Sequence, residues 1–397
     1  MSESFFSSQP SAQEIEERMR GYASWFELDL DSLGFNLEQV RRRVGVEVIP
    51  CLKGNAYGHG LVPLAAYLMK KGVKRVLVAK LWEAMQLRDA GLDCGVINMD
   101  ALFTPRQFET VVEREITQVV FSRETADMLS QAALKLGKRA EVFVKVDTGL
   151  NRVGVRYDKA ADLIEHLSSL RGLSLGGIFS TFSESSDLDK IQLDRMIALD
   201  QELRRRGIQV PLRSMASSHS ILHVPSSYLD AVRPGMMLLG IYPEPEDRQT
   251  GLALKPVLSF KGRLEQVKWI EAGESVTYSK RFVAPRRMKV GTVHAGYSDG
   301  FPRGLTQKGV VRVGDAVKPV LGTVSVNHHI VDLDGTEAKE GDTIELVSRE
   351  GENSLTNLAR IANLSVYVFC VALSPLTPRV YYEKGVPVAL SEPRLTG

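Results

Sequence analysis

The sequence has little that would tie it to a membrane or a nucleic acid. No apolar run approaches the roughly 20 residues that a membrane-spanning helix needs. The N-terminal segment lacks the basic start and apolar core of a signal peptide. Lysine and arginine number 50 against 48 aspartate and glutamate, and the net charge of +2 is spread along the chain. Nucleic-acid-binding proteins gather basic charge on one surface, so we expect no membrane and no nucleic-acid partner.

Cysteine is also scarce. Cys51, Cys94 and Cys370 are far apart, odd in number and set in apolar runs. This pattern excludes a disulfide framework and a cysteine metal site, and it indicates buried thiols in a reducing compartment. We therefore expect a cytoplasmic protein. There is no internal repeat or low-complexity tract, and 397 residues suffice for two domains with hydrophobic cores.

From Trp25 to about Tyr242, short β-rich runs alternate with amphipathic helical segments. One such helix is predicted to follow an N-cap at Asp31-Ser32. The predicted strands are Trp25–Leu28, Glu47–Leu52, Arg75–Ala79, Gly95–Asn98, Gln118–Phe121, Glu141–Val146, Leu175–Ser180, Leu212–Ala216 and Met237–Ile241. Eight or nine strands alternating with helices predict a (β/α)8 barrel. The spare strand is expected to be the first, as part of another domain.

Past Pro243 the pattern changes to a polar linker and then to short strands punctuated by glycine and aspartate. The predicted strands are Val257–Val267, Val276–Tyr278, Lys289–His294, Gly309–Val313, Val317–Leu321, Val324–Leu333 and Thr343–Val347, with one helix, Leu355–Ala362, after Ser354. We therefore predict an α/β protein: a barrel domain over residues 1–250, with the first strand excepted, and a mostly β C-terminal domain over 251–397.

Lys53 follows a predicted barrel strand and precedes the small, turn-forming residues GNAYGHG. Small neighbours let the backbone approach a ligand closely, and an amine in a partly dry pocket can attack a carbonyl. The alternative is that Lys53 is a surface lysine in a glycine-rich turn, which would be the preferred interpretation if only a Lys-Gly pair were present. Other polar residues also adjoin predicted strands, where the working residues of such barrels gather: Lys145 to Arg152, Thr181, Ser217, Ser218, and Arg233-Pro234-Gly235, which precedes the last strand.

The stretch VIPCLKGNAYGHG resembles the pyridoxal-phosphate lysine motif of alanine racemases, and the resemblance extends from about Ala23 to Tyr382. It implies that Lys53 bonds covalently to pyridoxal 5'-phosphate and that Tyr57 bonds the cofactor phosphate. KVDTGLNRVGV resembles the family's K-x-D-T-G-x-x-R segment. On that match Arg152 holds the substrate carboxylate, and Lys145, carbamylated in many members, orients the arginine. A guanidinium suits this task because it bonds two carboxylate oxygens at once.

ASSHSIL and the spacing to Arg233 resemble the family's phosphate serine and pyridine arginine. The resemblance implies that Ser218, with the backbone amides of Gly235 and Met236, cradles the phosphate. Arg233 would face the pyridine nitrogen and leave it unprotonated, which weakens the cofactor as an electron sink and favours return of the proton over transamination.

In the second domain, ESVTYSKRF resembles the family's V-S-Y-G segment and implies that Tyr278 is a second acid/base. The alternative is a packed aromatic in a strand. AGYSDGFPR resembles the family's G-Y-A-D-G-x-x-R turn, which implies that Tyr297 lies near the substrate entrance. The segment from Gly322 to His328 stands where the family has G-R-I-C-M-D-Q, which implies that the backbone N–H of Val326 binds the carboxylate. In this family the second acid/base comes from the partner subunit, so a head-to-tail homodimer with shared active sites is implied.

Three positions depart from the family pattern. Thr181 replaces a histidine, the G-R-I-C-M-D-Q segment is altered, and the tyrosine of S-Y-R-V-P-R is missing from Leu373–Arg379, which leaves room for a larger substrate side chain. The adjacent His328 and His329 are expected to point to opposite faces of a strand. No metal site is predicted.

The resemblance implies a pyridoxal-phosphate-dependent racemase that interconverts L- and D-amino acids, with a small amino acid, alanine or a larger one, as substrate. Two alternatives stay open. One is a decarboxylase of the related barrel-plus-β class, although its triple-glycine loop and Glu-Pro-Gly-Arg segment are absent here. The other is a non-catalytic relative that only binds the cofactor.

Overall fold

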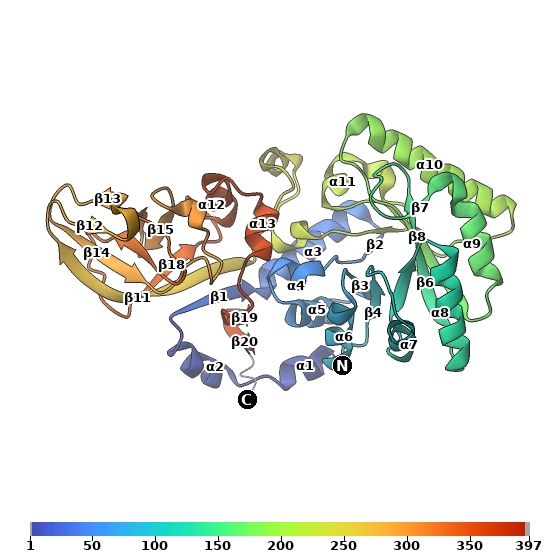
Figure 1. Ribbon diagram of the computed structural model, residues 1–397, viewed down its shortest axis with the longest axis horizontal. Helices are drawn as coiled ribbons and strands as arrows, with labels where there is room; N and C mark the ends of the chain where they lie inside the picture. Colours follow the sequence, from blue (N-terminus) through green and yellow to red (C-terminus); the bar gives the residue numbers. More distant parts are fainter. Residues whose placement is uncertain (1, 394–397) are drawn as a thin grey trace.

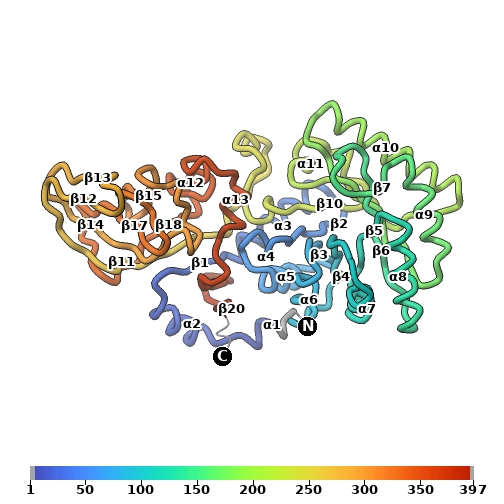
Figure 2. Tube along the Cα trace, viewed as in Figure 1, coloured from blue at the N-terminus to red at the C-terminus, as the bar shows by residue number. Residues whose placement is uncertain are grey.

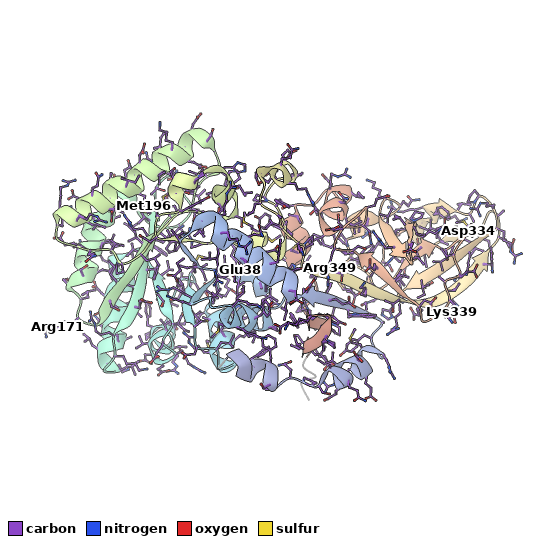
Figure 3. The ribbon with its side chains drawn as sticks, turned by 180° about the vertical axis from the view of Figure 1, so that it is seen from behind. Glu38, Arg171, Met196, Asp334, Lys339 and Arg349 are labelled. Atoms are coloured by element: carbon purple, nitrogen blue, oxygen red, sulfur yellow. The ribbon has the colours of Figure 1, made fainter. Side chains whose placement is uncertain are left out.

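The computed structural model describes residues 2–393. The molecule is elongated, with a helix-coated barrel at one end and an antiparallel β region at the other (Figure 1). The Cα trace shows β1 and α13 lying between the two parts (Figure 2). Seen from behind, Arg171 on the barrel and Asp334 and Lys339 of the β region mark opposite ends (Figure 3).

Eight parallel strands of the described chain form the barrel, in the order β2-β10-β9-β8-β6-β5-β4-β3. Past the end of β2, a bridge between Cys51 and Leu77 of β3 closes the ring, and the Leu52 amide bonds the Leu77 carbonyl at 2.8 Å. The strands are β2 Glu47–Val48, β3 Arg75–Val78, β4 Gly95–Asn98, β5 Thr117–Val120, β6 Ala140–Asp147, β8 Leu173–Phe179, β9 Arg213–Ser214 and β10 Ala231–Val232, with the short β7 Val155–Arg156 paired to β6. The predicted (β/α)8 barrel is confirmed.

The barrel interior is filled by one buried side chain from each strand or its flank: Ile49, Leu77, Ile97, Val119, Phe143, Phe179, Leu212 and Ala231. This layer makes the barrel a packed core, so ligands must bind at an end. The surrounding helices are α3 Leu30–Val44, α5 Leu61–Lys70, α6 Leu81–Asp89, α7 Pro105–Glu113, α8 Arg123–Lys135, α9 Ala160–Ser169, α10 Ser186–Arg205 and α11 Ser218–His223. Two helices, α1 Ser2–Ser7 and α2 Ala12–Met19, precede β1.

The second sheet runs in the order β14-β17-β16-β15-β18-β11-β1-β19-β20. Its strands are β1 Ser24–Asp29, β11 Leu258–Ile270, β14 Met288–Val293, β15 Val310–Val313, β16 Ala316–Leu321, β17 His329–Asp332, β18 Thr343–Val347, β19 Arg379–Glu383 and β20 Val386–Ser391. A ribbon of β12 Ser275–Val276 and β13 Phe282–Val283 stands apart, and α12 Leu355–Ile361 and α13 Val366–Val371 follow β18. The fold is therefore a barrel followed by a mostly β region.

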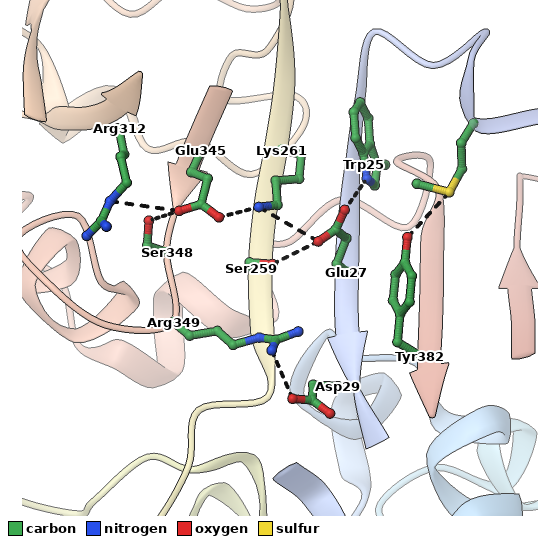
Figure 4. A network of polar contacts seen from close by, with 11 residues as sticks. Trp25, Glu27, Asp29, Ser259, Lys261, Arg312, Glu345, Ser348, Arg349 and Tyr382 are labelled. Atoms are coloured by element: carbon green, nitrogen blue, oxygen red, sulfur yellow. Dashed lines mark hydrogen bonds and ion pairs between the residues drawn. The ribbon is translucent and has the colours of Figure 1, made fainter. Parts of the chain in front are cut away.

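Strand β1 is held in this second sheet by a polar network that crosses to β11 and β18 (Figure 4). Lys261 lies between Glu27, 3.8 Å from its carboxylate, and Glu345, with which it forms an ion pair. Arg349 reaches back to Asp29 at 2.9 Å. Asp29 also caps α3, because its Oδ1 accepts from the Asp31 amide at 3.0 Å. The network thus links the first strand and the first barrel helix to the second sheet.

Several sequence predictions were wrong in detail. The predicted strand Met237–Ile241 is a buried 3-10 helix, η3 Met236–Leu239, and the last barrel strand is Ala231–Val232. A short apolar run does not distinguish a buried helical turn from a strand. Arg233-Pro234-Gly235 therefore follows the last strand, at its C-terminal end. Tyr278 does not end a strand but begins the 3-10 turn η5 Tyr278–Lys280. Of the predicted strand Val324–Leu333, only residues 329–332 are a strand. The N-cap of α3 is Asp29 and not Asp31-Ser32.

The helix predicted after Ser354 is present as α12, with Ser354 at its N-cap position. Among residues 2–393, no helix combines the length and the apolar character that crossing a bilayer would require.

Candidate active site

Lys53 begins a left-handed turn at the C-terminal end of β2. The element α4 Lys53–Tyr57 has positive φ at Gly54, Asn55, Ala56 and Tyr57. Left-handed helical backbone costs about 1–2 kcal/mol for each residue other than glycine, so the surroundings must hold this turn. Strain of this kind concentrates at functional sites. The turn fixes the direction in which the Lys53 side chain leaves the strand.

A buried carboxylate, Glu83, holds the turn in place. Its Oε1 accepts from the Asn55 amide at 2.9 Å, and its Oε2 accepts from the amides of Ala79 and Lys80 at 3.0 and 3.1 Å. The Asn55 side chain in turn accepts from the Leu61 amide at 2.8 Å. Glu83 thereby joins the Lys53 turn to the end of β3. The sequence analysis missed this residue, since a glutamate early in a helix usually caps it.

The second sheet also contacts the turn from outside the barrel. The Arg379 guanidinium donates to the Gly58 carbonyl at 2.9 Å. A Cβ on Gly58 would stand 2.1 Å from the Cys370 carbonyl of α13, and its φ is +79°. Only glycine meets both conditions. The segment 373–379, in which the family tyrosine is missing, thus serves here to anchor Arg379, which bonds the Leu373, Ser374 and Thr377 carbonyls.

The residues expected at the cofactor phosphate converge. Ser218 begins α11, and its Oγ accepts from the Gly235 amide at 3.1 Å. Across from it, the Tyr57 hydroxyl lies 2.6 Å from the point where a Cβ on Gly235 would stand. Met236 opens η3 directly after this glycine. Two hydroxyls and a glycine backbone at one place form a cradle that a side chain would fill, and such a donor set fits a phosphate.

Burial raises the pKa of the Tyr57 phenol well above its ordinary value, with the nearby Cys51 thiol adding to the effect. Tyr57 is therefore a neutral hydroxyl that donates one hydrogen bond; its partner in this structure is the Cys51 sulfur at 3.6 Å. A weak acceptor such as sulfur is readily exchanged for a phosphate oxygen.

Arg233 lies at the C-terminal end of β10 and is held by neutral partners. Its Nη1 donates to the Ser214 hydroxyl and its Nη2 to the Ser180 carbonyl, both at 2.5 Å. Its guanidinium stacks 4.8 Å from the centre of the Phe179 ring. Burial lowers the pKa of Arg233 to about 10, so it remains a cation near neutral pH. This rigid, buried charge suits an uncharged ring acceptor such as a pyridine nitrogen.

Lys145 lies on β6, near the C-terminal end of that strand. It is 8% exposed, its Nζ donates to the Thr181 hydroxyl at 2.5 Å, and it stands 4.6 Å from the Phe179 ring centre. Burial lowers its pKa well below the ordinary value, and the charges of Arg233, Arg152 and Lys53 lower it further, opposed by Asp147. The charges of Lys53, Arg152 and Arg233 thus act on the Lys145 amine at this end of the barrel. Such a site attracts anions.

Thr181, which replaces the family's histidine, is fixed at the same end. Its carbonyl accepts from the Gln192 side chain at 2.9 Å, and Gln192 also donates to Thr148 at 3.1 Å. The Thr181 hydroxyl accepts a hydrogen bond from the Lys145 amine. The consequence is a direct contact between the substituted position and the lysine that is expected to orient Arg152.

Tyr278 belongs to the far end of the molecule. It is 71% exposed, and the strands that flank it, β12 and β13, lie at the end of the second region away from the barrel (Figure 1). Around it, Thr277, Ser279 and Lys280 all have positive φ, a local strain that is common at functional sites. Its backbone is tied to Thr323, whose hydroxyl donates to the Tyr278 carbonyl at 3.3 Å. Within one chain the structure does not bring Tyr278 to Lys53.

Tyr297 and Val326 lie on two loops that are bonded to each other. The Tyr297 amide donates to the Ser325 carbonyl at 3.2 Å, and the Ser298 amide to the Val326 carbonyl at 3.0 Å. Both side chains are partly exposed, at 43% and 46%. The structure thus brings Tyr297 and Val326 together on one exposed surface, separate from the group of predicted residues at the end of the barrel.

Tyr367 of α13 was not singled out from the sequence. Its ring lies edge-on to Tyr57, with centroids 6.1 Å apart, and burial raises the pKa of its phenol to about 12. No spacing or motif in the apolar run of α13 signals this contact, which arises because α13 packs on α4. Tyr367 thereby supplies an aromatic ring beside the expected phosphate position, near the segment where the family's own tyrosine is missing.

Comparisons with known proteins were made on the whole chain. Residues 28–243 match the family model described as "Alanine racemase, N-terminal domain", and residues 257–381 match "Alanine racemase, C-terminal domain". The chain is 34% identical to the alanine racemase of Clostridium perfringens over 90% of its own length and 95% of the relative's. It is 32% identical to that of Clostridium tetani, with 91% and 96% covered.

Solved structures agree. The alanine racemase of Clostridium difficile 630 superposes with a TM-score of 0.89 at 28% identity, covering 94% of this chain and 99% of that one. The alanine racemase of Bacillus anthracis, solved with bound L-Ala-P, gives 0.85 at 25% identity, with 93% and 97% covered.

Proposed function

This chain belongs to the alanine racemase family, and on that premise we propose that it interconverts L- and D-amino acids on pyridoxal 5'-phosphate bound covalently to Lys53. The observation that carries the proposal is the cradle formed by Ser218, Gly235 and the Tyr57 hydroxyl, with the charges of Lys53, Arg152 and Arg233 acting on the buried Lys145 at the same end of the barrel. Phosphate and the substrate carboxylate are both anions, and this end of the barrel carries the positive charges of Lys53, Arg152 and Arg233. We propose a small amino acid as substrate, alanine or a larger one.

The cofactor is held by residues whose chemistry suits each of its parts. Tyr57 and Ser218, with the amides of Gly235 and Met236, bind the phosphate, and Arg233 donates to the pyridine nitrogen. When bound, pyridoxal phosphate withdraws electrons from the Cα–H bond of an amino acid. Because Arg233 remains charged beside the ring nitrogen, it limits that withdrawal and favours return of the proton to Cα.

Arg152 binds the substrate carboxylate, and Lys145 sets its position. In its neutral form the buried Lys145 amine adds dissolved carbon dioxide, forming an N–C bond and releasing one proton to solvent. The resulting carbamate is an anion among cations, so it bonds Arg152 and orients its guanidinium. A neutral amine is required for this addition, and burial beside positive charges favours that form because it lowers the pKa of Lys145.

Racemisation removes the proton from one side of the α-carbon and returns a proton to the opposite side, so an acid/base group is needed on each side. Lys53 Nζ exchanges the proton on one face, and the Tyr278 hydroxyl of a partner subunit exchanges it on the other. The exposure of Tyr278 and its distance along the molecule from the barrel support a head-to-tail homodimer. Tyr297 and Val326, on neighbouring loops, then border the substrate of the partner's barrel.

The test is subunit complementation, read by Cα deuterium exchange and loss of chirality over a panel of L-amino acids. Lys53→Ala and Tyr278→Phe are each expected to be inactive. After the two proteins are unfolded and refolded together, about a quarter of wild-type activity is expected, since random pairing makes half of the dimers mixed and each has one intact site of two. Activity that stays absent would mean that the tyrosine acts within its own chain, and a Tyr278→Phe protein that is active by itself would mean that the tyrosine is not required.

The cofactor linkage is tested separately. Borohydride reduction of the loaded enzyme, followed by peptide mapping, is expected to find the cofactor on Lys53. A cofactor on another lysine, or none, would overturn the assignment. The fastest substrate of the panel defines the side chain that the pocket accepts.

A further inference from the structure

Three side chains that could bind a metal meet on one face of the second sheet, away from the barrel. His328 Nε2 lies 2.9 Å from a Glu265 carboxylate oxygen, and His294 Nδ1 lies 3.7 Å from the same oxygen. One ligating atom from each of the three residues lies within 4.8 Å of the other two. The two imidazole rings are tilted by 43° with centroids 4.5 Å apart. All three residues are at least partly open to solvent.

The sheet brings them together through its register. Strand β14 lies between β11 and β17, and Val293 is paired with His329, so His294 stands opposite His328 on the next rung. Glu265 is the extra residue where the register of β11 shifts, between Leu264 and Gln266. A bulge re-aims the side chain it carries, and here it directs the carboxylate toward the histidine pair.

His329 points the other way, as the alternation of a strand requires. It is fully buried, its ring stacks on Phe301 at 4.5 Å, and its Nδ1 contacts the Ala295 carbonyl at 2.7 Å. The sequence correctly predicted that His328 and His329 would not share a ligand. It did not reveal that His328 has a second histidine across the strand.

We propose that Glu265, His294 and His328 bind one divalent first-row transition-metal ion, with Zn²⁺ as the natural occupant. Tetrahedral zinc with bonds of about 2.0–2.1 Å places neighbouring ligand atoms about 3.3 Å apart, between the two separations observed. Two imidazoles and one carboxylate are a zinc-type set with a position left for water. Calcium and magnesium, which take six or more oxygen ligands, do not suit it.

The ion ties together the two loops that carry Tyr297 and Val326. His294 precedes Tyr297 on one loop and His328 follows Val326 on the other, and these loops are bonded through Ser298 and Ser325. A Cβ on Gly296 would stand 2.1 Å from the Val326 carbonyl, so the loops are in direct contact. On the proposed function, which this step rests on, the ion holds the loops that border the partner's substrate.

Binding is tested with Co²⁺ and Zn²⁺ on the cofactor-loaded enzyme freed of unbound cofactor. Calorimetry with Zn²⁺, and the visible absorbance of bound Co²⁺, are expected to give one ion per chain. Glu265→Gln, His294→Ala and His328→Ala are each expected to weaken binding at least tenfold. His166→Ala is the matched control, since His166 contacts Asp127 at 2.7 Å in the same way but does not belong to this three-residue cluster. A wild-type protein that binds no ion, or binding unchanged in His294→Ala, overturns the site.

The role of the ion is tested by amide hydrogen exchange, which does not depend on racemase activity. Zn²⁺ is expected to slow exchange in residues 294–299 and 323–328 of the wild type and to have no effect in His328→Ala. If the ion binds yet these segments exchange at an unchanged rate, the loop-tying role is wrong. A protein that binds zinc and slows these segments but racemises no amino acid would contradict the proposed function and leave the metal site standing.

Discussion

The Tyr57 hydroxyl lies 2.6 Å from the point where a Cβ atom on Gly235 would stand. The Tyr57 ring is 7% exposed and is packed against Tyr367, so it has little room to move away. A residue with any side chain at position 235 would therefore displace the hydroxyl from the phosphate cradle.

Gly235→Ala is expected to lower the affinity for pyridoxal phosphate at least tenfold, measured by fluorescence titration of the apoenzyme. Gly21→Ala is the control, because its Cβ would meet only the Arg18 carbonyl at 3.4 Å, an ordinary contact. Cofactor affinity unchanged in Gly235→Ala would mean that the phosphate lies elsewhere.

Tyr367→Ala is expected to weaken cofactor binding about two- to tenfold, since an edge-on aromatic pair contributes about 0.5–1.5 kcal/mol beyond its buried area. Tyr367→Phe is expected to bind as the wild type does, because the contact with Tyr57 is made by the ring. Val368→Ala, on the same helix and 49% exposed, controls for changes in α13. If Tyr367→Phe instead weakened cofactor binding, the Tyr367 hydroxyl would be assigned a direct hydrogen bond to the phosphate.

Labelled bicarbonate is expected to give a carbamate carbon signal by NMR that is absent in Lys145→Gln. Burial lowers the pKa of Lys145 and so favours the neutral amine, the form that adds carbon dioxide. Acid protonates the amine and reverses the addition. The signal should therefore fade as the pH is lowered. Its persistence in Lys145→Gln would place the modification on another residue.

Thr181→Val is expected to raise KM for the amino acid several-fold while changing kcat less. The Thr181 hydroxyl bonds Lys145 at 2.5 Å, and Lys145 is proposed to orient the arginine that binds the carboxylate. Thr181→Ser keeps the hydroxyl and should retain the wild-type KM. Steady-state kinetics of the three proteins distinguish this positioning role from a purely structural one, which would lower kcat and stability together.

The free energy of unfolding is expected to fall in mild acid because the buried His59 is less readily protonated in the folded state than in the unfolded state. Its ring is fully buried, and burial lowers its pKa to about 4, against about 6.5 in an unfolded chain. Between these values the unfolded state binds the proton and the folded state does not, so stability is full above about pH 6.5 and falls by about 1.4 kcal/mol per pH unit down to about pH 4.

His59→Asn keeps a donor in place for the Tyr57 carbonyl, which the His59 Nδ1 contacts at 2.8 Å, and removes the titration. Urea unfolding of both proteins at pH 7 and pH 5 measures the difference. Equal pH dependence in the two proteins would mean that other groups cause the acid loss.

Local sequence determined much of this protein. The alternation of strands and helices predicted the barrel, and the polar residues at strand ends marked where chemistry would occur, because parallel strands deliver their C-terminal ends to one side. Strand positions for β4 and β18 were correct to the residue. Met237–Ile241 failed because a buried turn and a buried strand have the same apolar composition.

Only the tertiary structure decided which distant residues meet. Glu83 holds the Lys53 turn by a hydrogen bond, and the Tyr367 ring lies beside Tyr57. The Thr181 hydroxyl accepts a hydrogen bond from the Lys145 amine. Each contact joins elements that are separate in the chain. His294 and His328 meet because two antiparallel strands share a register, and Glu265 joins them because a bulge turns it. Such contacts depend on packing and pairing across the fold. Periodicity and motif spacing, which describe neighbours along the chain, carry no information about them.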